Sequence, residues 1–492
     1  MKKSMSFLAL AAALVLAVPL AAQPVPAGPE IALDQGLSSY KPALAAAADG
    51  GFLGVWAGAG QAGRISARAF APDGTPRSSI TVVRPVQSGQ RNDAGMEPTV
   101  VALSGGGYVV VWLNFSTTSN GDAIVFHFDV AFRLLDAAGQ PTGLETVVAE
   151  EAGPASVAAL PTGGFVLAWR EEGAMVVRRF DAHGVAVGGD IQGPNFGKPS
   201  LAALPDGGFV IAGSRDFFHL EYRIFAADGT PRTPMISLPT EAQQHGLGLW
   251  ISADAFGRFV IAWIDRFPDH LMNRVRARLF GPDGDPLGPE IAVSPEQATG
   301  NMWSGDVAMR PDGSFLVAWE QTFSGEVWAR AYGADGLPEG EAFPVYTLPG
   351  PHFRPDVEAT SCGWLVAWNT VHPYVRSFAA ADCVGSPTLY LNGGRFRVDV
   401  TWRVPSTGAH GTGTSIPRTG DTGAFWFFQP SNYELLVKVL DGRGANGHFW
   451  VFYGSLTNVE FDLTVTDTAT GQQRTYHNPA GTMASRADTT AF

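Results

Sequence analysis

A short aromatic phrase recurs along this 492-residue chain. It reads TGGFVLAW at 162–169 and DGSFLVAW at 312–319, and six of its seven copies end in tryptophan. The copies end at residues 56, 112, 169, 213, 263, 319 and 368, so they are 44 to 57 residues apart. A period of this size is typical of a supersecondary unit that is repeated and stacked, which restricts the chain to a few architectures.

Each period contains four segments typical of β-strands. An alternating run such as PTVVAL precedes the aromatic phrase, and a second run such as VWARAY and a short run such as EIAVS follow it. Turns rich in Gly and Asp, such as GPDGDPLG, separate these runs. Four antiparallel strands in a repeat of this length are typical of a propeller blade. The sequence therefore predicts an all-β protein with a seven-bladed β-propeller over 28–385.

The two ends of the repeat array complement each other. The seventh repeat has three strand-like runs before residue 383, whereas GPEIALD at 28–34 resembles the fourth run GPEIAVS at 288–294. We expect the N-terminal segment to complete the last blade, which closes the ring and covers an exposed strand edge.

One copy of the phrase, LPDGGFVIAG, ends in Gly213 where the others carry an indole. The difference breaks a packing pattern and not a catalytic one. We expect Phe217 or Phe218, in the following segment, to fill the space.

The N-terminus has the features of a secretory signal peptide over 1–22. Two lysines precede an apolar run that ends in small residues near Ala22, where we expect cleavage. This predicts a secreted or periplasmic protein without a membrane span. In such an oxidising compartment Cys362 and Cys383 are predicted to form a disulfide, with two unpaired thiols as the alternative.

The repeat stops near residue 386, and a second domain is predicted over 386–492. Strand-like runs such as GAFWFFQ and YELLVKVLDG are joined there by Gly and Asp turns. This pattern predicts a small β-sandwich whose alternate aromatic side chains form the core.

Two resemblances to known families lie in these segments. The D-G-G-F-V-x-A-W phrase resembles the repeats of exported bacterial β-propellers. The tail, from NYELLVKVLDGRGANGHFWVFYGSL to the closing DTTAF, resembles a C-terminal β-domain that recurs on otherwise unrelated secreted bacterial proteins. The first resemblance implies the fold, and the second implies an accessory or sorting role. Neither implies a characterised activity.

Catalytic and metal-binding motifs are scarce. The sequence contains no H-E-x-x-H, G-x-S-x-G, P-loop or paired C-x-x-C motif. GAGQAG at 58–63 matches a dinucleotide fingerprint, but an alternating strand and not a helix follows it, which indicates a hairpin loop. SADAFGRF at 252–259 partly resembles the box of sialidase-type propellers, but the arginine cluster of that family is not recognisable. We therefore expect no cofactor and no bound metal.

The variable loops on one face of the propeller are the expected place for binding, because loops on a rigid scaffold commonly carry function. The candidate binding residues on this face are Glu97, Arg215, Asp265, Asp269, His270, Trp303, Asp306, Arg354 and Asp356. Glu97, Asp306 and Asp356 lie near the start of innermost strands. If they converge at the channel mouth, they can share a proton, bind a cation or hold a sugar. A solvated loop surface of mixed charge is the alternative.

These features favour a monomeric binding protein that holds a protein or carbohydrate ligand on its loop-rich face without catalysis. An extracellular polysaccharide hydrolase or lyase that uses the carboxylates of that face is one alternative. A structural or surface-display protein is another. The net charge of −13 argues against nucleic acid or an anionic membrane as the main partner.

Overall fold

The computed structural model describes residues 24–27, 29–34, 39–47, 49–58, 63–72, 74–85, 94–120, 123–193, 196–216, 219–238, 244–266, 273–295, 302–321, 324–360, 362–380, 388–392, 395–419, 421–429 and 432–492. Almost all regular structure in these ranges is β-strand, with one helical turn, α1 (Arg443–Asn446). In the same ranges, no helix is both long and apolar enough to cross a membrane. The predicted signal peptide over 1–22 lies outside them.

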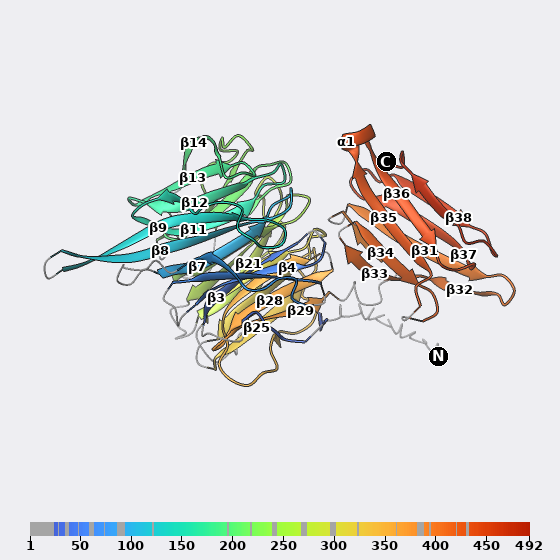
Figure 1. Ribbon diagram of the computed structural model, residues 1–492, viewed down its shortest axis with the longest axis horizontal. Helices are drawn as coiled ribbons and strands as arrows, with labels where there is room; N and C mark the ends of the chain where they lie inside the picture. The colour runs from blue at the N-terminus through green and yellow to red at the C-terminus, as the bar shows by residue number, and fades with distance from the viewer. Residues whose placement is uncertain are drawn as a thin grey trace, which may run out of the picture.

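The described strands between residues 25 and 379 form seven antiparallel sheets (Figure 1). The first three sheets are β3 (Ser39–Ala46), β4 (Phe52–Gly58), β5 (Ile65–Phe70) and β6 (Thr81–Arg84); β7 (Ala94–Ala102), β8 (Tyr108–Asn120), β9 (Ala123–Leu135) and β10 (Thr146–Ala149); and β11 (Ala152–Ala159), β12 (Phe165–Glu171), β13 (Ala174–Phe180) and β14 (Ala186–Gly193).

The next three sheets are β15 (Ser200–Ala203), β16 (Phe209–Asp216), β17 (His219–Phe225) and β18 (Ile236–Ser237); β19 (Gln244–Ala253), β20 (Phe259–Arg266), β21 (Asn273–Phe280) and β22 (Ile291–Ala292); and β23 (Met302–Met309), β24 (Phe315–Gln321), β25 (Glu326–Tyr332) and β26 (Phe343–Pro344). The last sheet combines β27 (Phe353–Thr360), β28 (Gly363–Asn369) and β29 (Pro373–Ala379) with two N-terminal strands, β1 (Val25–Pro26) and β2 (Ile31–Ala32).

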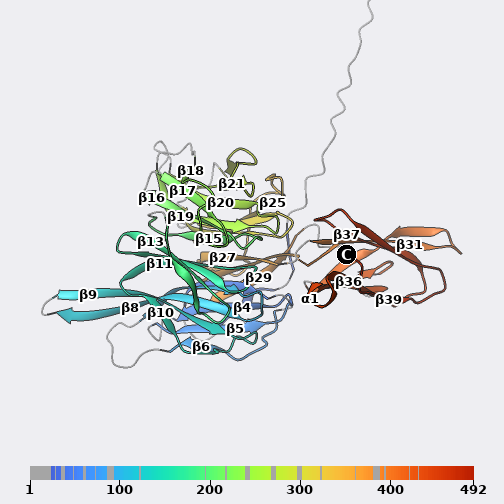
Figure 2. The ribbon, with the colours of Figure 1, turned by 90° about the horizontal axis from the view of Figure 1, so that it is seen from above.

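The first strands of these sheets surround a common centre. Each contacts the first strand of the next sheet, in the order β3, β7, β11, β15, β19, β23 and β27, and β27 contacts β3 again. A closed ring of antiparallel sheets is the arrangement of a β-propeller. Figures 1 and 2 both show this ring at one end of the molecule and strands β30 to β39 at the other.

The N-terminal segment closes the ring, as the sequence predicts. Both β1 and β2 pair with β29, with Ile31 opposite Val375. Leu33, which follows β2, is fully buried and packs in the core between the last sheet and the first. The chain end thereby covers the edge of β29, which is otherwise open to pairing with another chain.

The aromatic phrase forms the second strand of each sheet, where its aromatic side chains are buried and its glycine allows close approach of the third strand. All six of its tryptophans are buried. Its first aromatic residue stacks on the residue that ends the third strand, for example Phe165 on Phe180 with ring centroids 4.9 Å apart. The glycine before it is needed there, because a Cβ at Gly164 would lie 2.1 Å from the carbonyl oxygen of Phe180.

The copy that ends in Gly213 is completed by Phe196, which precedes β15. The N–H of Gly197 donates to the carbonyl oxygen of Ser214 at 2.9 Å and holds this segment against β16. Phe196 is fully buried, and a Cβ at Gly213 would lie 2.5 Å from its Cγ. The ring of Phe196 thus occupies the space beside the glycine, whereas Phe217 and Phe218 lie outside the described residues.

The C-terminal strands form two further sheets in the described residues. One contains β30 (Thr388–Leu391), β31 (Phe396–Val404), β32 (Ala409–Thr412), β37 (Glu460–Asp467) and β38 (Gln473–Asn478); the other contains β33 (Thr414–Thr419), β34 (Thr422–Trp426), β35 (Leu435–Gly442), β36 (His448–Ser455) and β39 (Ser485–Asp488). Side chains from both sheets meet in one core, which includes Phe396, Phe425 and Phe449. The alternate aromatics Trp450 and Phe452 are only partly buried.

Candidate functional site

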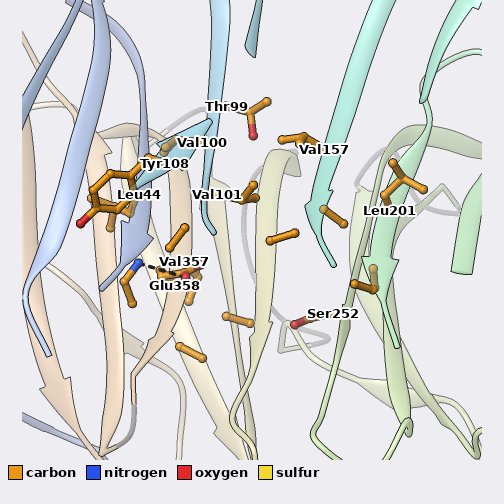
Figure 3. Close-up of a pocket in the computed structure, with 18 of the residues that line it drawn as sticks. Leu44, Thr99, Val100, Val101, Tyr108, Val157, Leu201, Ser252, Val357 and Glu358 are labelled. Carbon is orange, nitrogen blue, oxygen red and sulfur yellow. Dashed lines mark hydrogen bonds between the residues drawn. The ribbon is translucent and has the colours of Figure 1, made fainter. Parts of the chain in front are cut away.

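A cavity of about 1190 Å³ lies at the centre of the ring. It is lined by residues from the first strand of every sheet, and Figure 3 shows part of that lining. The first strand is the inner edge of each sheet. About half of its backbone N–H and C=O groups therefore have no partner strand and face the neighbouring sheet or the cavity. The side chains at this edge therefore decide both how the blades join and what the cavity can hold.

Side chains of one blade accept hydrogen bonds from the first strand of the next blade. The N–H of Val357 donates to Oδ2 of Asp306 at 2.8 Å, and the N–H of Leu44 donates to Oδ2 of Asp356 at 2.8 Å. Ser156 Oγ accepts from the N–H of Leu201 in the same way at 3.1 Å. The two aspartates thus have an architectural role, because they satisfy donors at a strand edge.

A second level of the same contacts lies two residues further along the strands. The N–H of Met309 donates to Ser252 Oγ at 3.0 Å, and the N–H of Ala46 donates to Oε1 of Glu358 at 3.1 Å. Figure 3 shows Ser252 and Glu358 at the wall of the cavity. Each of these acceptors keeps a further lone pair, and each serine hydroxyl keeps its proton for another partner.

Ser156→Ala is expected to lower the free energy of unfolding by about 1 kcal/mol, because the N–H of Leu201 loses its only side-chain acceptor among the described contacts. The shift is measured as the change in the midpoint of urea unfolding. The control is Ser237→Ala, since Ser237 is exposed in β18. Equal midpoints for wild type and Ser156→Ala would show that this bond does not stabilise the ring.

Three carboxylates of the wall, those of Asp306, Asp356 and Glu358, have raised pKa values. Burial raises the pKa of Asp306 to about 6 and that of Glu358 to about 8. Burial and the charge of Asp306 together raise the pKa of Asp356 to about 7, against the opposing charge of Lys41. The negative charge of one aspartate therefore opposes ionisation of the other.

Among the described residues, Lys41, Glu97 and Lys198 line the mouth of the cavity, and the charge of Arg354 also acts on Glu97. Each precedes a proline at the start of a first strand, in the pairs Lys41-Pro42, Glu97-Pro98, Lys198-Pro199 and Arg354-Pro355. In β7 and β27 the pairing register shifts at this point, from Met96 to Thr99 and from Phe353 to Asp356. A proline is tolerated there because a bulge leaves its position without a ladder hydrogen bond.

The backbone at two of these positions is in the left-handed region, with φ of 48° at Glu97 and 53° at Arg354. Residues with a side chain seldom adopt this conformation, and such strain is often retained at binding sites.

The four charges interact across the ring. Lys198 Nζ lies 3.4 Å from Oε2 of Glu97. Both side chains reach solvent, but the surrounding blades partly desolvate them. Desolvation opposes ionisation of Glu97, but the charges of Lys198, Lys41 and Arg354 lower its pKa below the ordinary value. Desolvation and the charge of Lys41 lower the pKa of Lys198, although Glu97 acts in the opposite direction. Cations from separate blades therefore act on the carboxylate of Glu97 at the mouth.

The structure brings four of the candidate residues together and separates others from them. Asp306 and Asp356 line the cavity with Glu97, and Arg354 interacts with Glu97 at its mouth. Trp303 is 57% exposed and is not part of the lining.

Arg215 forms an ion pair at 3.4 Å with the buried Glu221 and does not line the cavity either. Asp269, His270 and Cys383 lie outside the described residues, so these positions and the Cys362–Cys383 disulfide stay predictions.

The prediction that Asp265 lies on an exposed loop is wrong. Asp265 is fully buried within β20, where it pairs with Arg274 of β21. The error arose because these two strands extend beyond Trp263, whereas the sequence repeat suggests that the strand ends at the tryptophan.

Sequence reasoning missed Lys41, Lys198, Trp250 and Glu358. A signal for the two lysines was present, because a charged residue precedes proline at the same place in four repeats. Trp250 was also detectable by alignment of the repeats. It pairs with Ala262 as Asp306 pairs with Ala318, so both occupy the same position of the first strand.

Comparisons with known proteins find matches among solved structures at low sequence identity. No family model matches the sequence, and no curated protein matches it. Among solved structures, an α-L-arabinanase of Penicillium chrysogenum complexed with arabinobiose is 11% identical, with 74% of this chain and 99% of that chain covered and a TM-score of 0.42.

The Dos1 propeller is 8% identical, with 72% and 95% covered and a TM-score of 0.42. The β-propeller domain of the Trilobed protease from Pyrococcus furiosus is 9% identical, with 70% and 98% covered and a TM-score of 0.41. Identities and scores this low carry no activity over to the present chain.

Proposed function

We propose that the chain is an exported, monomeric saccharide-binding protein, built as a seven-bladed β-propeller over 28–385 and a β-sandwich over 386–492. Its ligand enters the central cavity from the loop-rich face. One observation supports this most directly. A single level of the cavity wall combines an indole, three hydroxyl groups and two carboxylates, contributed by Trp250, Thr99, Ser156, Ser200, Asp306 and Asp356.

These six residues occupy one register position in six different blades. Each lies opposite the residue that precedes the last position of the aromatic phrase, as Thr99 lies opposite Val111 and Ser200 opposite Ala212. All six are partly accessible. The level therefore presents an interrupted ring of donors and acceptors around the space.

This combination of an indole, hydroxyl groups and carboxylates suits a sugar better than a wholly apolar ligand. Hydroxyl groups of a sugar both donate and accept, and Ser156, Asp306 and Asp356 keep capacity beyond their bonds to the next blade. The flat face of an indole packs against the apolar face of a sugar ring, while polar groups fix its orientation. Trp250 is the aromatic member of this level.

The test measures binding of the full mature chain to a panel of neutral and acidic oligosaccharides by titration calorimetry. At least one is expected to bind, and Trp250→Ala is expected to weaken it at least tenfold, since stacking on the indole is lost. Trp303→Ala is the matched control, because that indole is exposed outside the cavity. Both variants are checked for folding by their thermal midpoints. If no saccharide binds, or if both variants bind as wild type does, the proposal is wrong.

A hydrolase or lyase is the second candidate, and one observation favours it. Asp306 and Asp356 have raised pKa values in a cavity wall, as a general acid and its partner require. If this candidate holds, wild type shortens a bound oligosaccharide and Asp356→Asn does not. Recovery of the intact oligosaccharide after prolonged incubation with wild type would exclude it for that ligand.

A further inference from the structure

We infer that the saccharide is acidic, and that Lys41, Lys198 and Arg354 bind its carboxylate at the mouth of the cavity while its ring lies beside Trp250. This inference rests on the proposed function and adds the class of sugar, a uronic acid or another sugar acid. It also adds an orientation, with the acid group toward the loop-rich face and hydroxyl groups inward.

The first argument is the local balance of charge. Among the described residues that line the mouth, Lys41 and Lys198 lie near Glu97, and the Lys198–Glu97 ion pair leaves the positive charge of Lys41 in excess. The Lys198–Glu97 pair is also open to exchange, since its two side chains are 61% and 49% exposed. The excess stands out on a chain whose net charge is −13.

The second argument is how the cations are placed. Lys41 and Arg354 precede prolines at register shifts of β3 and β27, and Lys198 precedes a proline just before β15. A shift of this kind re-aims a side chain at the end of a strand. The positive φ of Arg354 is a conformation that residues with a side chain seldom adopt. Because the cations occupy the same position in separate blades, their convergence follows from the repeat and not from the conformation of one loop.

The third argument is the distance between the cations and the level of Trp250. Lys198 lies two residues before Ser200, and Arg354 lies two residues before Asp356. At a rise of about 3.3 Å per residue, the two levels are at most about 7 Å apart. A sugar acid carries its carboxylate on the ring carbon chain, so both levels can contact one residue of the saccharide.

The fourth argument is the charge deeper in the cavity. Asp356 and Glu358 lie inward of Arg354 on β27, and Asp306 lies on β23 at the level of Asp356. Their contacts with backbone N–H groups of the next blade fix all three in the wall. An anionic group is repelled from this part of the cavity wherever these groups are ionised, whereas sugar hydroxyl groups donate to them. The gradient from cations outside to carboxylates inside therefore gives the ligand one orientation.

The test compares acidic oligosaccharides with the same molecules as methyl esters, which keep the backbone and lose the charge. Oligogalacturonate, oligomannuronate and glucuronate-bearing xylan oligosaccharides are titrated into the full mature chain. At least one acid is expected to bind at least tenfold more tightly than its ester, and added salt is expected to reduce that preference.

The double variant Lys41→Gln, Lys198→Gln is expected to remove the preference for the acid while it keeps the affinity for the ester. The matched control is the double variant Arg170→Gln, Arg474→Gln, which removes two positive charges from exposed positions outside the cavity lining. A control that loses the preference equally would show that overall charge, and not the mouth, attracts the acid.

The outcomes separate this inference from the proposed function. Equal affinity for acid and ester, with binding that still depends on Trp250, overturns the acidic ligand and leaves a saccharide-binding protein. Tighter binding of a sulfated saccharide than of every carboxylated one also overturns it. If no saccharide of any kind binds, both are wrong.

Discussion

Phe196→Ala is expected to lower the free energy of unfolding by about 3–5 kcal/mol, the cost typical of removing a buried aromatic ring. Phe196 is fully buried and packs with Met175, Val177 and Ile211 in the core between two blades. No indole is available to refill the space, because the aromatic phrase ends in Gly213 here. The loss is measured by urea unfolding and by the thermal midpoint. Phe256→Ala, at a residue that is 45% exposed, is the control and is expected to cost about 0.5 kcal/mol or less.

The relation between Phe196 and Gly213 gives this prediction a second test. In wild type, Gly213→Ala is expected to destabilise, because its Cβ would lie 2.5 Å from Cγ of Phe196. In the Phe196→Ala background, Gly213→Trp restores the side chain of the other repeats and is expected to recover part of the loss. A double-mutant cycle measures the coupling. Strictly additive effects would show that the two residues do not share one packing space.

The repeat made much of the fold predictable because it is a local signal. Each copy carries its own turn, aromatic pair and alternating runs, so strand identity follows from short stretches of sequence. Ring closure was predictable for the same reason, because the sequence of the segment containing Ile31 resembles that of a fourth strand. Phe196 was not, because it lies between repeats and its contact with Gly213 depends on how the segment before β15 folds back.

The candidate site was predictable only in part, because it is made by residues that are far apart in the chain. Asp306 and Asp356 were recognised from their charge near the start of innermost strands. Glu358 lies only two residues from Asp356, but nothing local shows that its carboxylate accepts from Ala46 of the first blade. Lys41 and Lys198 belong to a ring that appears only when the blades are aligned with one another. The ends of strands were also hard to predict: Asp265 was expected in a loop but is buried within β20.

The stability of the ring is expected to fall as pH rises from about 5 to about 9, and Glu358→Gln is expected to remove much of that fall. Burial raises the pKa of Glu358 to about 8 from an ordinary value of 4.5, and the charges of Asp356 and Asp306 add to the effect. The folded chain thus binds this proton more tightly than the unfolded chain. Its contribution to stability is complete below the unfolded pKa and is lost as pH rises through about 8.

One unit of pKa difference corresponds to about 1.4 kcal/mol. Because Glu358 is partly accessible, screening by solvent reduces the effect, and we expect a loss of about 2 kcal/mol. Glutamine keeps an oxygen that accepts from the N–H of Ala46 and carries no charge to desolvate. The free energy of unfolding is measured in urea across this pH range for wild type, Glu358→Gln and the control Glu341→Gln, whose side chain is 88% exposed. Parallel pH profiles for wild type and Glu358→Gln would show that the ring does not hold this carboxyl group in its neutral form.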